Sequence, residues 1–333
     1  VDLRDGMPRP PASRDYITKL TATGPSDDPA CLSFLRFLDE ATGSDKDTIR
    51  LLQQFSGYGL TGYTKEHVAL FVYGPGGNGK SVFANVLLHV LGDYAMTAPM
   101  DIFTSSGFDR HPTELAMLRG ARVVTASETE ADRTWAEARI KQLTGGDPIT
   151  ARFMRQDFFT YRPAFKLLMV GNHLPALQNV DDAIKRRLLI VPFTNKPRTI
   201  DRDLEKKLKR EAPGILRWMI QGCLDWQQNG LIRPDTMKKT TDQYFEEQDT
   251  FGQWLDINYV IDPFKVSWWV TSKELYRSWC GFAEENGETP GSQKSLASRL
   301  GRYGLDRVTR SVAGKNARGW VGIRRKYPGD QDV

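Results

Sequence analysis

The spacing of hydrophobic positions changes along the chain and separates a helical region from an α/β region. Between residues 15 and 62 the apolar residues recur at helical spacing, as in 31–38 and 49–55. Apolar runs rich in β-branched residues then follow at 67–73, 122–126, 165–170 and 188–193, separated by helical or looped stretches. Strands that alternate with helices predict an α/β fold with a mostly parallel sheet.

After these runs the pattern returns to helix, at residues 203–210 and 215–227. Residues beyond 250 indicate helices followed by two short strands around Gly314. We therefore expect a linker at 1–14, an N-terminal helical region at 15–62, an α/β core at 63–197, a helical connector at 198–249 and a C-terminal unit at 250–333. Because the sequence begins at Val1 and not at methionine, we expect it to be part of a longer protein.

Composition excludes several classes of protein. The 333 residues are 40% hydrophobic and 26% charged, which is ordinary for a soluble globular protein. No apolar run reaches the ~18 residues that a membrane-spanning helix needs, so we expect no membrane partner. Cys31, Cys223 and Cys280 lie too far apart for a zinc knuckle, and they fit a reducing compartment such as the cytoplasm.

A glycine-rich segment directly after the first apolar run fits the pattern G-x-x-x-x-G-K-[ST]. Its residues are Gly74, Pro75, Gly76, Gly77, Asn78, Gly79, Lys80 and Ser81. Glycines let backbone N–H groups surround phosphate oxygens, and the following helix adds its positive end. The pattern predicts that Lys80 binds the β- and γ-phosphates and that the Ser81 hydroxyl binds Mg²⁺. The alternative is a glycine-rich turn with an incidental lysine.

Further polar residues follow the later apolar runs. Glu128 and Glu130 come at the end of the second run, where an ATPase needs carboxylates for Mg²⁺ and for the attacking water. Asn172 follows the third run and could hold that water or the γ-phosphate. Arg186 and Arg187 precede the fourth run, and an arginine delivered to a neighbouring subunit stabilises charge in the transition state. Taken alone, each also fits a solvated loop.

Together these residues resemble superfamily III helicases, in particular the primase-helicases of phages, plasmids and poxviruses. The segments that carry the resemblance are GPGGNGKS (74–81), ASETE (126–130), KQLTGGDPITAR (141–152), KLLMVGNHLP (166–175) and IKRRLLIVPF (184–193). The resemblance implies a P-loop, AAA+-like core with an N-terminal helical oligomerisation region and a C-terminal winged helix. The acidic motif is Glu-Thr-Glu and not two adjacent acids, so the roles of Glu128 and Glu130 stay open.

The same resemblance implies ATP and Mg²⁺ as cofactors and single-stranded or forked DNA as the partner. It further implies a homo-oligomeric ring, expected to be a hexamer, that hydrolyses ATP between subunits. A primase-polymerase domain is expected in the same full-length chain. If a phage encodes the protein, the expected location is the bacterial host cytoplasm.

Two regions are candidates for binding DNA. Residues 149–162 predict a hairpin in which Arg152 and Arg155 interleave with aromatic residues, a combination that follows a nucleic-acid backbone and stacks on bases. Such a hairpin could point into the channel of a ring, and Lys141 could face the channel or the next subunit. The alternative is a hairpin whose aromatic face packs in the core.

The second region is the C-terminal unit, where residues 291–327 contain ten Lys and Arg residues and one Asp. Helices followed by a β-wing fit a winged helix-turn-helix. Its candidate DNA contacts are Lys294, Arg299, Arg302 and Lys315. Ten positive charges and one negative charge give this segment a net charge of +9, whereas the net charge of the whole chain is only +5. The alternative is a solubilising surface without a partner.

The function that we expect is an ATP-dependent replicative DNA helicase. A DNA-binding replication initiator that uses ATP only as an assembly switch is the main alternative. A P-loop kinase for a small substrate is the third, although a kinase would not need the basic C-terminal unit or the Arg186–Arg187 segment.

Overall fold

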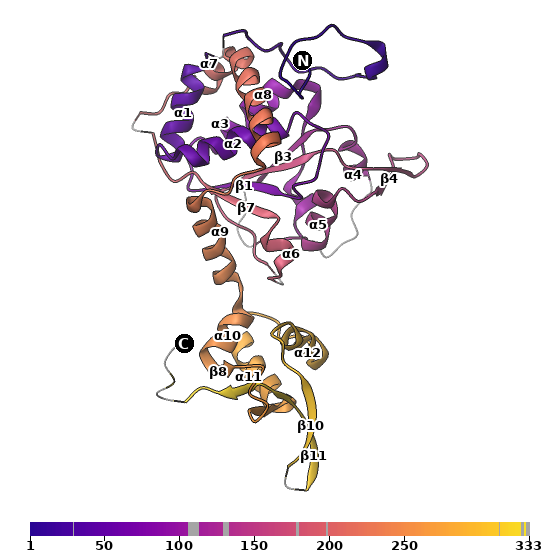
Figure 1. The fold of residues 1–333 in the computed structure, drawn as a ribbon, viewed down its shortest axis with the longest axis vertical. Helices are drawn as coiled ribbons and strands as arrows, with labels where there is room; N and C mark the ends of the chain where they lie inside the picture. Colours follow the sequence, from indigo (N-terminus) through magenta and orange to yellow (C-terminus); the bar gives the residue numbers. More distant parts are fainter. Residues whose placement is uncertain are drawn as a thin grey trace. The chain divides into compact units, whose positions relative to one another are not determined.

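The computed structural model describes residues 1–28, 30–105, 113–128, 133–177, 180–197, 199–312, 314–327 and 330. The chain divides into two compact units, Val1–Tyr244 and Phe245–Val333. Figure 1 shows the elements of both units, and each unit is described by itself below. Within the described residues, no helix is both long enough and apolar enough to cross a membrane.

The N-terminal unit is built on a five-stranded sheet with the order β2-β3-β6-β1-β7. All four neighbouring pairs of strands are parallel. The strands are β1 (Ala69–Tyr73), β2 (Ala95–Thr97), β3 (Val123–Glu128), β6 (Lys166–Gly171) and β7 (Leu188–Pro192). The four predicted apolar runs form β1, β3, β6 and β7, which confirms the α/β fold with a central parallel sheet. Strand β2 was not predicted, because three residues are too few to show a pattern.

Helices cover both faces of this sheet (Figure 1). The helices of this unit are α1 (Leu32–Thr42), α2 (Lys46–Tyr58), α3 (Lys80–Leu91), α4 (Thr113–Met117), α5 (Glu137–Gly145), α6 (Asp182–Lys185), α7 (Leu204–Arg210) and α8 (Ala212–Asn229), and α9 (Asp235–Gln248) begins in this unit. The main core joins α1, α2, α3 and α8 to one face of the strands. Arg50 of α2 also forms an ion pair with Asp225 of α8, at 2.7 Å, and lowers the pKa of Asp225 to about 2.

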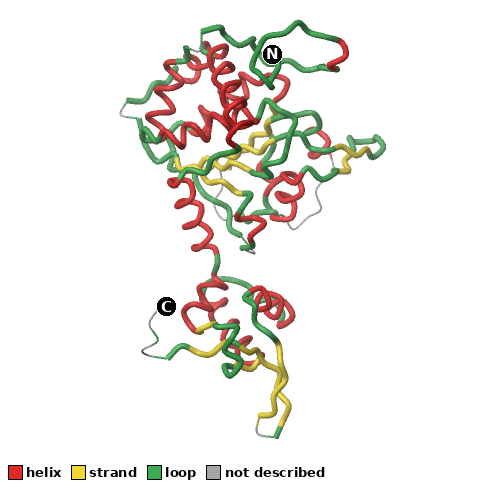
Figure 2. Tube along the Cα trace, in the orientation of Figure 1, coloured by secondary structure: helices red, strands yellow, loops and turns green. Residues whose placement is uncertain are grey.

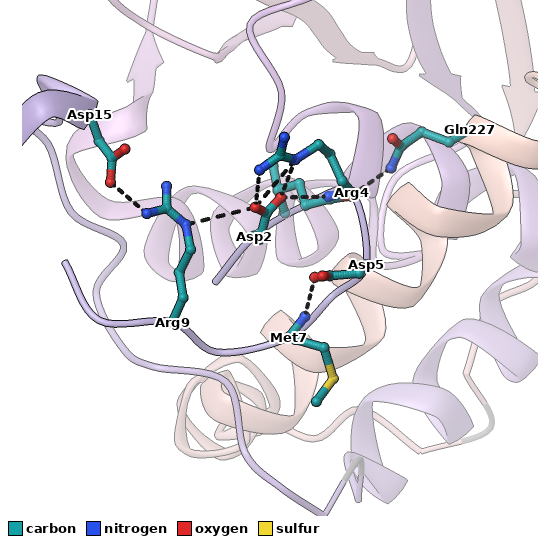
Figure 3. A network of polar contacts seen from close by, with 8 residues as sticks. Asp2, Arg4, Asp5, Met7, Arg9, Asp15 and Gln227 are labelled. Atoms are coloured by element: carbon teal, nitrogen blue, oxygen red, sulfur yellow. Dashed lines mark hydrogen bonds and ion pairs between the residues drawn. The ribbon is translucent and has the colours of Figure 1, made fainter. Parts of the chain in front are cut away.

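The N-terminal segment differs from the expectation. Helix begins only at Leu32 and not near residue 15, because Pro25 and the neighbouring turn residues do not favour helix. The residues predicted as a linker have no helix or strand except a 3-10 turn at Ser13–Asp15. They nevertheless contact α8, since Gln227 donates to the Leu3 carbonyl at 2.7 Å. Figure 3 shows the ionic network of this segment, in which Asp2 lies between Arg4 and Arg9.

A short antiparallel hairpin extends from the N-terminal unit (Figure 2). Its strands are β4 (Ile149–Ala151) and β5 (Phe159–Tyr161), with Ile149 opposite Tyr161. The hairpin predicted over residues 149–162 is therefore present. Arg155 lies in its turn with φ of +59°.

The C-terminal unit combines three helices with small antiparallel sheets. The helices are α10 (Thr250–Asn258), α11 (Ser272–Glu285) and α12 (Gln293–Arg302). The strands are β8 (Tyr259–Ile261), β9 (Trp269–Thr271), β10 (Arg307–Val312), β11 (Lys315–Val321) and β12 (Ile323–Arg325). Strands β10 and β11 form the hairpin expected around Gly314, and β9 pairs with β11. Buried Trp254, Leu275 and Trp279 lie in the core between the helices. Strands β8 and β9 were not predicted, because each has only three residues.

Candidate functional site

The register of the sheet brings the carboxyl ends of three strands together. Tyr73 of β1 and Glu128 of β3 both lie opposite Gly171 of β6. Carboxyl ends of parallel strands meet at one edge of a sheet. The glycine-rich loop, Glu128 and Asn172 therefore share this edge. The structure describes the backbone of Glu128 but not its side chain, and Glu130 lies outside the described residues.

The loop between β1 and α3 has the conformation that its glycines allow. Gly77 and Gly79 have φ of +81° and +87°, in the left-handed region that favours glycine. A Cβ at Gly79 would lie 2.5 Å from the Phe37 ring, whereas a Cβ at Gly76 or Gly77 would meet nothing within 4 Å. One side of the loop is thus packed against α1. The other side is open above the first turn of α3, where unpaired N–H groups favour an anion.

Lys80 lies inside the loop and not in solvent. Only 6% of the residue is exposed, and burial lowers the pKa of its side chain. Its Nζ donates to the carbonyl oxygens of Gly74 at 2.7 Å and Pro75 at 3.0 Å, and to Oδ1 of Asn78 at 2.8 Å. Asn78 is itself buried and donates to the Phe193 carbonyl. These bonds hold the lysine tip in place beside the open side of the loop.

Ser81 and Asn172 are both exposed at this edge of the sheet. Ser81 is the second residue of α3, and Asn172 is the first residue after β6. The Ser81 hydroxyl and the carboxylate of a glutamate such as Glu128 are hard oxygen donors, which suit Mg²⁺. A neutral amide at Asn172 can donate or accept a hydrogen bond without adding charge.

A cavity of about 650 Å³ lies beside the loop, and no motif indicated it. Its walls come from α1, the loop and residues within 195–197 and 199–207, and they include Arg36, Phe37, Glu40, Gly79, Asn195 and Arg202. Arg36, Glu40 and Arg202 are exposed, whereas Phe37 is buried against the loop. The wall segments are far apart in sequence, so only the folded chain reveals that they meet.

Arg186 and Arg187 lie at the opposite edge of the same sheet. They directly precede β7, and the Arg187 carbonyl accepts from Ala69 N, at the amino end of β1, at 2.8 Å. Five residues of β1 separate this point from the loop, about 16 Å at ~3.3 Å per residue. Arg186 is exposed, whereas Arg187 is half-buried and donates to the Ala183 carbonyl at 2.9 Å. Burial, followed by the neighbouring Arg186, lowers the pKa of Arg187.

Lys141, a candidate DNA contact, has an intramolecular partner. Its Nζ lies 2.6 Å from Oδ2 of Asp181, and the two side chains are 26% and 30% exposed. Oδ1 of Asp181 accepts from Ile184 N at 2.8 Å and so caps α6, the helix that leads to Arg186. The structure thus connects Lys141 to the arginine segment through α6.

The hairpin exposes basic and aromatic side chains together. The Arg152 guanidinium lies 4.6 Å from the centre of the Phe158 ring. Phe153 and Phe158 are 38% and 59% exposed, and Arg155 is exposed in the turn. Phe153 and Phe158 are therefore not packed in the core, whereas Phe159 and Tyr161 are half-buried, so the alternative of a packed aromatic face applies in part to these two.

In the C-terminal unit, Lys294, Arg302 and Lys315 are exposed. Arg299 differs, because it is half-buried and its guanidinium lies over the rings of Phe251 and Trp279, at 5.4 and 5.6 Å. Of the four candidate DNA contacts, Arg299 therefore packs against the core of its own unit.

Comparisons with known proteins find sequence similarity to viral proteins. The sequence model of a family of unknown function (DUF5906) matches residues 72–187. "Putative helicase L207/L206" of Acanthamoeba polyphaga mimivirus is 27% identical over 260 residues, which cover 70% of this chain and 27% of that protein. "Putative helicase 022R" of Frog virus 3 (isolate Goorha) is 27% identical over 290 residues, covering 79% and 30%. "Putative helicase V13" of Sputnik virophage is 23% identical over 298 residues, covering 81% and 37%.

The chain resembles viral helicases. These matches confirm the resemblance that the motifs predicted, although the chain spans only 27% to 37% of the length of these relatives. The apo structure of the NrS-1 C-terminal region has a TM-score of 0.59 at 12% identity. It covers 90% of this chain and 77% of that one, and it shows a similar fold.

The ion pair between Lys141 and Asp181 predicts a measurable coupling. In a double-mutant cycle of Lys141→Met and Asp181→Asn, we expect the two changes in the free energy of unfolding to be non-additive by about 0.5 to 1 kcal/mol, because both side chains are partly shielded from water. Urea unfolding of the N-terminal unit measures the coupling. The more exposed Lys207–Asp201 pair is the control, with a smaller expected coupling. Additive effects at Lys141 and Asp181 would contradict the link to α6.

Proposed function

We propose that the chain is the motor of an ATP-dependent replicative DNA helicase of a phage or mobile element. The observation that carries the proposal is the position of the motifs on the sheet. The glycine-rich loop, Glu128 and Asn172 share one edge, whereas Arg186 and Arg187 lie at the other. This separation fits a ring in which the arginines of one subunit reach the nucleotide of the next. The similarity to viral proteins named as helicases supports the same conclusion.

At the first edge, the loop would bind the phosphates of ATP. Backbone N–H groups at the start of α3 would face the phosphate oxygens, and the Lys80 ammonium is already held in the loop. The Ser81 hydroxyl and the Glu128 carboxylate would hold Mg²⁺, which neutralises phosphate charge when bound. Asn172, and Glu130 if it returns to this edge, would orient the attacking water. The cavity beside the loop would receive the nucleoside, with Phe37 as its apolar wall.

At the second edge, Arg186 and Arg187 would stabilise negative charge on the γ-phosphate of a neighbouring subunit. The Lys141–Asp181 pair would help to position them through α6. In such a ring, each nucleotide site would be completed by the arginines of the next subunit. A hexamer is the proposed form of the ring.

DNA would bind to two surfaces. The hairpin would place Arg152 and Arg155 on the sugar-phosphate backbone, with exposed aromatic rings available to stack on bases. In the C-terminal unit, helices α11 and α12 followed by the β10–β11 hairpin have the order of a winged helix. Its exposed Lys294, Arg302 and Lys315 would contact phosphates. A primase-polymerase domain elsewhere in the full-length chain completes the proposal.

The proposed role of the glycine-rich loop predicts the effect of a change at Lys80. Lys80→Ala is expected to reduce ATP hydrolysis to background, because the cation that contacts the β- and γ-phosphates is removed. Phosphate release measures turnover, and circular dichroism measures the fold. Lys46→Ala, at an exposed lysine of α2, is the control and is expected to hydrolyse ATP normally. Retained turnover in Lys80→Ala would refute the loop assignment. ATP-dependent DNA binding without any turnover in the unmodified chain would favour the initiator.

The proposed action of arginine across the subunit boundary predicts the effect of a change at Arg187. Arg187→Ala is expected to bind ATP normally but to hydrolyse it about 1000-fold more slowly, the effect of losing an arginine finger. Mixing Arg187→Ala with Lys80→Ala is expected to restore part of the activity, since some interfaces then combine an intact loop with an intact arginine. Arg186→Ala, measured in parallel, separates the roles of the two arginines. If no mixture shows recovery, action across the subunit boundary is wrong.

The proposed winged helix predicts how the affinity for DNA depends on salt. Changing Lys294, Arg302 and Lys315 to Gln is expected to reduce the slope of log affinity for duplex DNA against log salt by up to about 2.7, at ~0.9 for each phosphate that is no longer neutralised. Fluorescence anisotropy at several salt concentrations measures the slope. The control changes Lys46, Lys206 and Lys239, which are exposed in the N-terminal unit, to Gln. Equal slopes for the two variants would exclude the winged-helix surface.

A further inference from the structure

The Tyr244 hydroxyl joins two segments that follow different strands of the sheet. Tyr244 is only 4% exposed. Its hydroxyl accepts a hydrogen bond from Nε1 of Trp135 at 3.0 Å and donates to the carbonyl of Pro175. Burial raises the pKa of Tyr244 above its ordinary value, so the hydroxyl keeps the proton that it donates.

Both segments lead back to the candidate nucleotide site. Pro175 lies three residues after Asn172, in the loop that follows β6, and Trp135 lies in the segment that follows β3 and Glu128. The backbones of the two segments are also joined, because Trp135 N donates to the Ala176 carbonyl at 2.9 Å and Ala176 N donates to the Arg133 carbonyl at 2.7 Å. The Trp135 ring packs edge-on against Phe71 of β1, with ring centres 5.8 Å apart. The two segments that Tyr244 contacts are thus bonded to each other, and the Trp135 ring also packs against β1.

Helix α9, which contains Tyr244, packs beside β7, the outermost strand on one side of the sheet. β7 is the last strand in the sheet order, and the hydroxyl of Thr241 accepts from Ile190 N of β7 at 3.2 Å. Just before the helix, Arg233 donates to the Arg186 carbonyl at 3.0 Å. Tyr244 is the last residue of the N-terminal unit, yet α9 continues without a break to Gln248. Helix α9 therefore contacts β7 and the loop after Asn172, and the residue two positions before the helix contacts the arginine segment.

We propose that Tyr244 is a positioning residue that holds the Asn172 loop against the segment after Glu128 and connects both to α9. A displacement of the loop during ATP turnover then acts directly on the helix that enters the C-terminal unit. This inference rests on the proposed function in its link to turnover. The positioning of the loop itself does not depend on that function.

The test is Tyr244→Phe, which keeps the ring and removes only the hydroxyl. We expect kcat for ATP hydrolysis to fall about tenfold or more while KM for ATP changes less than twofold, because misplacement of Asn172 affects the reaction more than binding through the loop. Stimulation of turnover by DNA is expected to fall as well. The control is Tyr58→Phe, since Tyr58 is also buried and its hydroxyl accepts from Glu66 N, far in sequence from this junction. It is expected to keep wild-type kcat and DNA stimulation.

A second measurement does not require turnover. Hydrogen exchange at the backbone amides of Trp135 and Ala176 is expected to accelerate in Tyr244→Phe but not in Tyr58→Phe. Equal exchange and equal kcat in the two variants would overturn the proposal, and so would a loss in Tyr244→Phe that tracks a general fall in Tm. If the unmodified chain shows no ATPase, the proposed function fails, and the exchange result alone decides whether Tyr244 positions the loop.

Discussion

The candidate site depends on the parallel register of β1, β3 and β6. Gly171 lies opposite both Tyr73 and Glu128, and Gly74 N donates to the Gly171 carbonyl at 3.3 Å. A shift of one strand by a single residue would move each side chain to the other face of the sheet and carry its polar end away from its neighbours. The register is held by the apolar core, since the strands are buried and α3 and α8 cover one face. The polar residues need only follow the ends of these strands.

The same sheet separates the two groups of residues on which the proposed chemistry depends. The two ends of a parallel strand lie at opposite edges of the sheet, so residues that directly precede one strand lie about a strand length from residues that directly follow its parallel neighbour. Arg187 precedes β7 and the loop follows β1, and these two strands are buried neighbours in the sheet. The α6 cap at Asp181 and the hydrogen bond from Arg233, just before α9, to the Arg186 carbonyl hold the arginine segment at its own edge. A site shared between copies is the simplest use of this geometry.

Much of the arrangement could be predicted from the sequence, for local reasons. Four of the strands in the central sheet coincide with the predicted apolar runs, and the loop and Asn172 directly follow two of these strands in sequence. The cavity could not be predicted, because Phe37 and Arg202 meet only after α1 packs beside the loop. Neither could the Lys141–Asp181 pair or the Tyr244 contacts, which join residues 40 or more positions apart without a repeating pattern. Helix was also expected too early in the N-terminal segment, where local helical spacing did not reveal the loop up to Leu32.

The position of Lys80 has an energetic consequence for the proposed ATPase cycle. Its three donor hydrogens already face oxygens of Gly74, Pro75 and Asn78. A phosphate that enters the loop must exchange for these acceptors, so the lysine contributes only the difference between two sets of hydrogen bonds to affinity. After hydrolysis the lysine can return to its own loop, which compensates for the departure of the γ-phosphate. In the proposed cycle, these internal acceptors would lower the net affinity for phosphate and so would favour release over tight binding.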